Sequence, residues 1–288
     1  MKNSPISNIT LEGREFLVKR DDLIDPYLAG NKYRKLYTLL NTPHKTYKKI
    51  ISYGGTQSNA MLAIAALAKE KSWEFIYYTK PLSAQQRVQN SEAGNFFHSV
   101  ELGMKHVEIS EDLYRDFISS LRLHLDEKTC IIDQGGAVEE AKAGLEVLAQ
   151  EIREADLGVK SLATPSGTGT TALFLALAMP EYRVYTTPSV GDEEYLKEQM
   201  SALHEIPQNL IILKPEKKYH FAKPYPAFLE IYNKLLKGGI EFDLLYAPGM
   251  WKVLLEQTQE KVLYIHSGGV TGNESMLKRY EKKGFINL

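Results

Sequence analysis

Short apolar runs alternate with longer stretches of helical periodicity from about residue 48 to the end of the chain. Clustered apolar residues favour strands, and apolar residues spaced three and four apart favour helices. The predicted strands cover residues 49–53, 74–79, 129–133, 161–164, 183–187, 209–213 and 262–266. The predicted helices cover residues 58–69, 87–102, 114–125, 139–154, 170–179, 192–203 and 227–237. This alternation predicts parallel sheets that helices cover on both faces.

The number of predicted strands is too large for one compact sheet in a chain of 288 residues. We therefore expect two α/β domains, each with a parallel sheet. No segment rich in Pro, Gly or Ser separates them, so the chain must cross between the domains near residues 45 and 140. The large domain would comprise residues 1–45 and 140–288, and the small domain residues 46–139.

Charge and composition exclude several classes of partner. Lys and Arg number 35 and Asp and Glu 36, which gives a formal net charge of −1. A nearly neutral chain lacks the positive field that attracts nucleic acids or anionic membranes. The longest apolar runs, residues 60–68 and 172–179, are far shorter than the roughly 20 residues of a membrane span. The chain is therefore expected to bind neither nucleic acid nor a membrane.

The single cysteine, Cys130, cannot form a disulfide within the chain, which is typical of proteins in a reducing cytoplasm. It lies in an apolar stretch and is interpreted as a small buried hydrophobic residue. The N-terminal segment shows neither an apolar signal core nor an arginine-rich targeting pattern. We therefore expect a soluble cytoplasmic protein.

Five glycine-containing turns are candidates for ligand binding, because ligands in parallel α/β folds bind where strands end and helices begin. They are AGNK (29–32), GGTQSN (54–59), QGG (134–136), SGTGTT (166–171) and HSGG (266–269). SGTGTT gives the strongest indication of a phosphate site. Its glycines admit a ligand close to backbone amides, and its threonines add hydroxyl donors.

Two other interpretations of SGTGTT stay open. Gly167, Gly169 and Ala172 also fit the spacing of a dinucleotide-binding turn, and Asp192 and Glu193 follow as candidate ribose ligands. These acids come several residues after the end of the next predicted strand, which is later than a ribose contact requires. The third interpretation is a tight turn without a ligand.

The turn GGTQSN and the segment around Lys32 each allow a structural and a functional interpretation. Thr56, Ser58 or Asn59 would serve as the N-cap of the apolar helix that follows, or the amides and hydroxyl there would bind a carboxylate. Lys32 lies in a basic run, which is usually a solvated surface. At a helix start beside a phosphate site, it would instead bind pyridoxal phosphate as a Schiff base.

Together and in this order, the turns resemble the 1-aminocyclopropane-1-carboxylate (ACC) deaminase and D-cysteine desulfhydrase family of pyridoxal-phosphate enzymes. The matching segments are KRDDL…GNKYRKL, GGTQSN, Gly94-Asn95, DQGGA…AGL, SGTGTT, the tyrosine that ends FDLLY, and IHSGG. They extend from residue 19 to about residue 269, which is essentially the whole chain. The resemblance implies the tryptophan-synthase-β-like arrangement called fold type II, with a large cofactor-binding domain and a smaller domain that contains the GGTQSN helix.

The resemblance also implies which residues hold the cofactor, pyridoxal 5'-phosphate. Lys32 would bind it covalently and then act as a general base. Asn59 would donate to the phenolic oxygen, and Ser267 would contact the ring nitrogen. The phosphate would be held by Gly167, Thr168, Gly169, Thr170 and Thr171.

For the substrate, the resemblance implies a small amino acid bound by Thr56, Gln57 and Ser58. The Ser58 hydroxyl would lie near the α-carbon, where it or Lys32 would take the proton. Tyr246, at the end of FDLLY, would be the catalytic tyrosine that assists the leaving group. The resemblance further implies a homodimer.

Departures from the family pattern bear on the reaction. The deaminase branch carries a glutamate directly after the catalytic tyrosine, and this chain has Ala247 in an Ala-Pro-Gly run. We therefore expect β-elimination from D-cysteine or a related amino acid, with ACC deaminase activity as the alternative. Ala29 replaces a usual glycine, and a second active-site tyrosine near Tyr219-His220-Phe221 has no clear position. The histidines show no metal-ligand spacing, so no metal is expected.

Two hypotheses of other classes stay open. The altered segment after Tyr246 would also suit a protein that binds pyridoxal phosphate without catalysing a reaction. The spacing of Gly167 and Gly169 would suit an NAD-dependent oxidoreductase. The oxidoreductase hypothesis explains neither Lys32 nor the turn GGTQSN.

Overall fold

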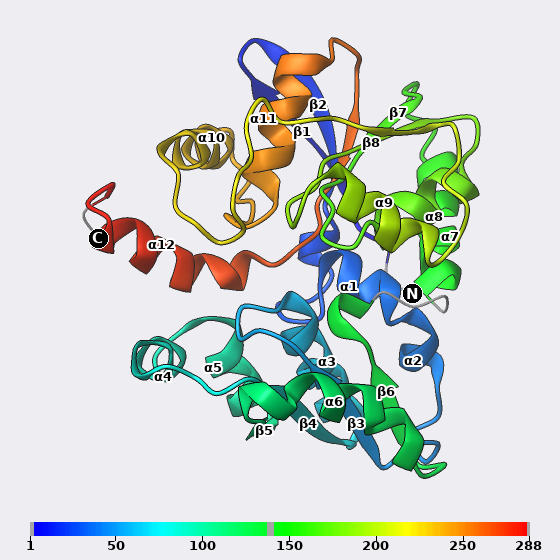
Figure 1. The fold of residues 1–288 in the computed structure, drawn as a ribbon. Helices are drawn as coiled ribbons and strands as arrows, with labels where there is room; N and C mark the ends of the chain where they lie inside the picture. The colour runs from blue at the N-terminus through cyan, green and yellow to red at the C-terminus, as the bar shows by residue number, and fades with distance from the viewer. Residues whose placement is uncertain (1–2, 137–140, 287–288) are drawn as a thin grey trace. The chain divides into compact units, whose positions relative to one another are not determined.

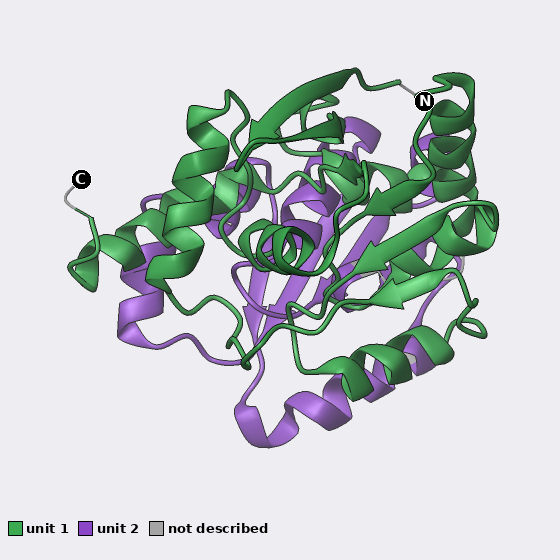
Figure 2. Cartoon of the chain, turned by 90° about the horizontal axis from the view of Figure 1, so that it is seen from above, with its two compact units in different colours: residues 1–37, 139–288 green, residues 38–138 purple. Residues whose placement is uncertain are grey.

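The structure is a computed structural model that describes residues 3–136 and 141–286. The chain forms two compact units, which Figure 2 shows in different colours. Unit 1 comprises residues 1–37 and 139–288, and unit 2 comprises residues 38–138. The sequence placed the crossings near residues 45 and 140, and the second of these positions lies outside the described residues.

Unit 1 contains a six-stranded sheet in the order β1-β2-β10-β7-β8-β9. From β2 to β9 every neighbouring pair is parallel, whereas β1 pairs with β2 in antiparallel register. The strands are β1 (Ile6–Leu11), β2 (Arg14–Lys19), β7 (Ser161–Ala163), β8 (Arg183–Thr186), β9 (Leu210–Ile212) and β10 (Leu263–Ile265). The parallel strands end at one edge of the sheet, where the candidate ligand turns begin.

Helices cover both faces of this sheet, and α10 and α11 lie apart from α7, α8 and α9 in Figure 1. One apolar core packs α7 to α9 against the sheet, and a second packs α10 and α11 against the other face. The helices of unit 1 are α1 (Gly30–Lys35), α7 (Ala141–Glu154), α8 (Thr170–Ala178), α9 (Glu193–Ser201), α10 (Pro226–Lys237), α11 (Ala247–Gln257) and α12 (Asn273–Lys282). Helix α2 (Tyr37–Asn41) spans the division between the units.

Unit 2 contains a four-stranded parallel sheet in the order β5-β4-β3-β6. Its strands are β3 (Lys49–Tyr53), β4 (Glu74–Thr79), β5 (Lys105–Glu108) and β6 (Thr129–Ile132). Its helices are α3 (Asn59–Lys71), α4 (Ala84–Asn90), α5 (Gly94–Glu101) and α6 (Glu111–Ser120). Helix α3 is apolar along most of its length, and its residues from Ala60 to Ala68 are almost all buried.

The structure corrects one prediction made from periodicity and contains strands that were not predicted. Residues 87–102 do not form one helix, because the extended backbone of Ala93 separates α4 from α5. The N-terminal hairpin β1–β2 and the short strand β5 were not predicted. The hairpin lies outside the strand–helix alternation, and β5 has half-exposed, mostly polar residues at the sheet edge.

A buried ion network fixes helix α1 in unit 1. The guanidinium of Arg34 lies 2.7 Å from Asp21 and 2.7 Å from Glu151 of α7. Lys19, at the end of β2, approaches Glu151 to 2.9 Å. Arg34 and Asp21 are fully buried, so each charge depends on its partners for compensation. This network joins the helix of Lys32 to β2 and α7.

Within the described ranges, no helix is long and apolar enough to cross a membrane. The same residues contain no group of three or more His, Cys, Asp or Glu side chains that could hold a metal ion.

We predict that Arg34→Met destabilises the protein by about 3–5 kcal/mol, because it leaves the buried carboxylate of Asp21 without a cation and removes one of the two cations beside Glu151. The matched control is Arg153→Met on α7, which removes the exposed ion pair with Glu181 and should cost no more than about 1 kcal/mol. The free energy of unfolding in urea measures both effects. Equal losses for the two variants would contradict the role given to the buried network.

Candidate active site

The turn SGTGTT connects β7 to the start of α8 and forms a cup of backbone amides. Gly169 is the N-cap of α8, and its φ of +78° lies in the left-handed region. A Cβ on this glycine would lie 2.3 Å from Cγ of Met200, so glycine is required here for two reasons. The first amides of α8 have no partner within the helix, and they are therefore available to an anion.

Threonine hydroxyls line this turn. The Oγ1 atoms of Thr168 and Thr170 lie 3.0 Å apart and share one hydrogen bond. Thr171 is buried, and its Oγ1 has no hydrogen-bond partner among the described residues. A buried hydroxyl without a partner is costly, so a ligand oxygen at this position would satisfy it.

The acids of the dinucleotide interpretation have other partners. The carboxylate of Asp192 caps α9 by accepting the backbone N–H of Tyr195 at 3.1 Å. Glu193 forms ion pairs with Lys197 at 2.5 Å and with Lys214 at 2.6 Å. Both carboxylates therefore have partners within the chain, and neither requires a ribose hydroxyl.

Lys32 lies in the first turn and a half of α1 and is half-buried. Burial lowers the pKa of its amine to about 8. Burial, together with the charge of Lys32, also holds the pKa of Lys35 well below its usual range. At neutral pH, Lys32 therefore has a larger fraction of neutral, nucleophilic amine than an exposed lysine.

The start of α1 packs on the turn that follows β10. A Cβ on Gly30 would lie 1.9 Å from the carbonyl oxygen of Ser267, so only glycine admits this approach. The backbone N–H of Asn31 donates to the same oxygen at 3.2 Å. Ala29 has extended backbone angles, which any residue adopts, so its replacement of a usual glycine requires no strain. Lys32 and Ser267 therefore come from two directly contacting segments.

Tyr246 lies against the SGTGTT turn. A Cβ on Gly167 would be 3.5 Å from Cε1 of Tyr246, which places the tyrosine ring directly beside this glycine. Burial is the main cause that raises the pKa of the Tyr246 hydroxyl well above its usual range, and the nearby carboxyl of Asp243 raises it further. The hydroxyl therefore stays protonated and can donate a proton or a hydrogen bond.

Asp243 holds the backbone that carries Tyr246. Its Oδ1 accepts the N–H of Leu245 at 3.0 Å and the N–H of Tyr246 at 2.6 Å. The side chain is fully buried, and burial raises the pKa of its carboxyl to about 7. No sequence motif marked Asp243, because a single acid in the apolar run FDLLY gives no sign of its backbone contacts.

In unit 2, the turn GGTQSN leads from β3 into α3. Ser58 is the N-cap of α3, and its Oγ accepts the N–H of Met61 at 3.2 Å, as the structural interpretation predicted. Asn95 donates to Oδ1 of Asn59 at 2.7 Å and to the carbonyl oxygen of Gln57 at 3.2 Å. Because its Oδ1 is the acceptor of this bond, Asn59 can use Nδ2 as a donor to a ligand.

The structure thus gathers part of the predicted site in unit 1 and part in unit 2. Lys32 and Ser267 lie on segments in direct contact, and Tyr246 contacts the turn 167–171. Thr56, Gln57, Ser58 and Asn59 follow one another at the start of α3. The sequence interpretation gave no role to Asp243, nor to the orienting contacts of Asn95. The ring nearest Tyr246 in the 219–221 segment is that of Phe221, with centroids 5.2 Å apart.

Comparisons with known proteins agree with this fold, although no family model matches the chain. A Thermotoga maritima protein named as a candidate ACC deaminase is 26% identical, and the match covers 90% of each chain. The crystal structure of an ACC deaminase homologue superposes with a TM-score of 0.75 at 21% identity, covering 97% of this chain and 94% of the other. A pyridoxal 5'-phosphate-dependent aspartate racemase gives a TM-score of 0.62 at 11% identity, with 93% and 90% covered.

These comparisons confirm the fold predicted from the sequence, which is fold type II of the pyridoxal-phosphate enzymes. They also confirm the resemblance to ACC deaminase-like proteins, which extends over nine tenths of the chain. Pyridoxal phosphate, the expected cofactor, is the cofactor of this group of enzymes.

We predict that Asp243→Asn removes a pH dependence from the stability of the protein. A raised pKa means that the folded state keeps its proton to higher pH than the unfolded state. Stability therefore falls as the pH rises from about 4 to about 7, by at most about 1.4 kcal/mol per pH unit. The asparagine variant keeps the Oδ1 acceptor and lacks this loss.

Urea unfolding from pH 5 to pH 8 gives the free energy of unfolding of the wild type and of Asp243→Asn. In the difference between the two values, the contributions of all other titrating groups cancel. The wild type should lose stability relative to Asp243→Asn up to about pH 7, after which the difference should level off. A difference that does not change with pH would contradict the assignment of a protonated, buried Asp243.

Proposed function

We propose that this chain is a pyridoxal-phosphate-dependent enzyme that eliminates the β-substituent of a small amino acid, with D-cysteine as the first substrate to test. The observation that carries this proposal is the environment of Tyr246. Its protonated hydroxyl lies beside the candidate phosphate turn, and the next residue, Ala247, is 1% exposed within an apolar core. A glutamate at position 247 would place a charge in that core.

The residues of unit 1 fit the cofactor. A phosphate suits the amides at the start of α8 and would satisfy the buried Thr171 hydroxyl. The amine of Lys32, with its pKa lowered to about 8, suits a covalent bond to an aldehyde. The hydroxyl of Ser267 suits a ring nitrogen that stays unprotonated. We carry over the roles of Thr56, Gln57, Ser58 and Asn59 from the family resemblance.

When bound, pyridoxal phosphate supplies an electron sink for the bond to the substrate's α-carbon. The amine of Lys32 would take the proton of the substrate's α-carbon, or the hydroxyl of Ser58 would do so. Tyr246 would donate its proton to the departing sulfur. Its raised pKa keeps the hydroxyl protonated at neutral pH, so that it has a proton to donate. Asp243 holds Tyr246 in position through the two backbone N–H groups. Water then releases pyruvate and ammonia.

ACC deaminase activity is the second candidate function, since the Thermotoga maritima relative carries that name. It opens a cyclopropane ring and would release 2-oxobutyrate instead of pyruvate. We rank it second because Ala247 offers no carboxylate beside Tyr246. In the cell we expect a cytoplasmic homodimer.

We predict that Thr171→Val weakens the binding of pyridoxal phosphate roughly 10- to 100-fold, because valine keeps the shape of threonine and loses a bond to a charged group. The matched control is Thr164→Val. Thr164 is also buried, with no partner for its Oγ1 among the described residues, and it precedes the turn. Absorbance titration gives the Kd of each variant.

Repeating this titration with pyridoxal, which has no phosphate, separates the phosphate contact from other effects. The deficit of Thr171→Val should then disappear. A deficit of the same size with both compounds, or an equal deficit in Thr164→Val, would contradict a phosphate site at this turn.

We predict that the protein loaded with pyridoxal phosphate releases pyruvate from D-cysteine and that Lys32→Ala lowers this rate at least about a thousandfold. The panel of substrates is D-cysteine, L-cysteine, D-serine and ACC, and keto acids are identified by chromatography. Lys282→Ala, at the exposed end of α12, is an activity control outside the proposed machinery.

Each result of the panel separates the hypotheses. Release of 2-oxobutyrate from ACC with no pyruvate from cysteine would show that the argument from Ala247 is wrong. A cofactor-loaded protein that yields no keto acid from any of the four compounds would point to a binding protein without turnover. Stabilisation by NADH but not by pyridoxal phosphate would support the oxidoreductase hypothesis.

A further inference from the structure

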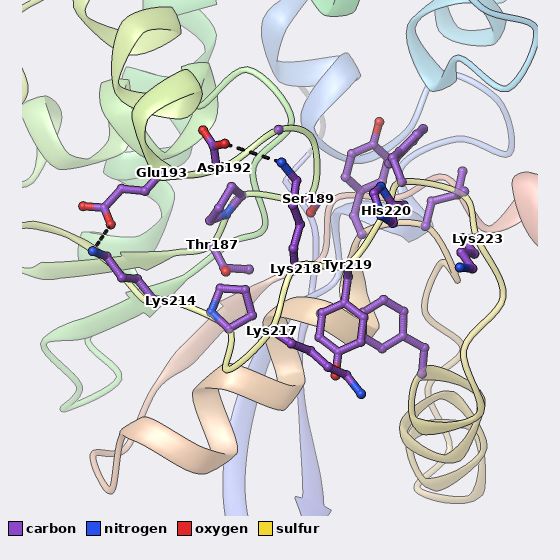
Figure 3. A pocket seen from close by; sticks show the side chains of 18 of the residues that line it. Thr187, Ser189, Asp192, Glu193, Lys214, Lys217, Lys218, Tyr219, His220 and Lys223 are labelled. Carbon is purple, nitrogen blue, oxygen red and sulfur yellow. Dashed lines mark ion pairs between the residues drawn. The ribbon is translucent and has the colours of Figure 1, made fainter.

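A pocket of about 270 Å³ lies beside Tyr246 in unit 1, and Figure 3 shows it from close by. Three segments line it, together with Phe228 of α10: the residues that follow β8, the segment 214–223, and the chain from Leu244 to Gly249. None of the roles derived above uses this volume. Because Tyr246 contacts Gly167 and also lines the pocket, the tyrosine links the pocket to the phosphate turn.

One wall of the pocket is aromatic. The rings of Tyr219 and Phe228 lie 4.5 Å apart between centroids, and those of Phe221 and Tyr246 lie 5.2 Å apart. Phe221 also lines the pocket and is 37% exposed, so part of its ring is open to a molecule in the pocket. This wall favours an apolar occupant.

The charged side chains around the pocket compensate one another. Four lysines and four acidic residues line it. Figure 3 shows two ion pairs between them: Lys214 lies 2.6 Å from Glu193, and Lys218 lies 3.5 Å from Asp192. Lys217 lies over the ring of Tyr219, at 5.6 Å from its centroid. The pocket therefore has no excess of positive charge to select an anion.

The pocket is much larger than the leaving group of cysteine. A cavity of about 10–15 Å³ already holds one water molecule, so about 270 Å³ has room for many non-hydrogen atoms. The sulfhydryl of cysteine has one such atom. A pocket of this size beside the proton donor would be mostly empty, or filled with water, during the turnover of cysteine.

We propose that this pocket receives the β-substituent of the substrate and that the preferred substrates are cysteine thioethers with a bulky, uncharged apolar group on the sulfur. This inference rests on the proposed function and defines its substrate class. The aromatic wall would contact the apolar group, and Tyr246, which lines the pocket and has its hydroxyl near Gly167, would face the departing sulfur.

The reaction balances with one water molecule. The Cβ–S bond breaks and its electron pair leaves with the sulfur, which takes a proton from Tyr246 and departs as a thiol. The α-proton goes to Lys32 or Ser58. Hydrolysis of the remaining three-carbon fragment gives pyruvate and ammonium. Thioether and water are thus converted into thiol, pyruvate and ammonium without an oxidant or a reductant.

The test compares S-methylcysteine with S-cyclohexylcysteine, both enantiomers of each, on the protein loaded with pyridoxal phosphate. Both release alkyl thiols of similar leaving ability, so the size of the apolar group is the main difference. We expect kcat/KM for the cyclohexyl compound to exceed that for the methyl compound at least tenfold. S-carboxymethylcysteine, which is charged, should be a poorer substrate than the cyclohexyl compound.

The variant Gly249→Leu tests the location. A Cβ at Gly249 would be 3.6 Å from Cζ of Phe228, an ordinary contact, so a leucine fits the backbone and its branches fill the pocket. We expect the cyclohexyl-to-methyl ratio of kcat/KM to fall at least tenfold. The matched control is Glu256→Leu, on the exposed side of the same helix, which should keep the wild-type ratio.

Calorimetry provides a second readout that does not require turnover. If the wild type binds the cyclohexyl compound more tightly than the methyl compound, and Gly249→Leu loses this difference, the pocket is supported. This holds even if no keto acid forms, and only the proposed function then fails. Two results overturn the inference: equal kcat/KM and equal Kd for the two compounds, or a cyclohexyl-to-methyl ratio of kcat/KM that Gly249→Leu leaves unchanged. In either case, turnover of D-cysteine still supports the proposed function.

Discussion

The buried contact of Arg34 with Asp21 and Glu151 is the interaction on which the candidate site of unit 1 depends. Helix α1 has only six residues, and an isolated helix of that length is not stable in water. The ion network supplies the tertiary anchor two residues after Lys32. With the helix fixed in this way, its first turn packs on the backbone of Ser267. Lys32 thereby has a defined position although it lies on a very short element.

Tyr246 is held in a comparable way by a buried polar group. Asp243 binds the two backbone N–H groups that precede α11, and its burial keeps the carboxyl partly protonated near neutral pH. The tyrosine ring then contacts the phosphate turn on one side and a pocket on the other. Two buried acids, Asp21 and Asp243, therefore position the chemistry without belonging to the proposed reacting groups.

Much of the fold follows from local patterns in the sequence. The strands 49–53 and 74–79 were predicted with the bounds that the structure gives, because their apolar runs are bounded by turn residues. The turn SGTGTT was recognised because its glycines and threonines lie together in the sequence. The pairing of Arg34 with Glu151 was not predicted, because these residues lie far apart and each resembles an ordinary surface charge. The contacts of Asp243 and Asn95 with backbone groups likewise leave no trace in the spacing of residue types.

The central claim is that Lys32 binds pyridoxal phosphate covalently. The most direct test is to load the protein with pyridoxal phosphate, reduce it with borohydride, and locate the labelled lysine by mass spectrometry of its peptides. We expect a label on Lys32. Lys35 is the stringent alternative, because it lies on the same helix, is buried, and also has a lowered pKa. A label on Lys35 or on any other lysine would contradict the account.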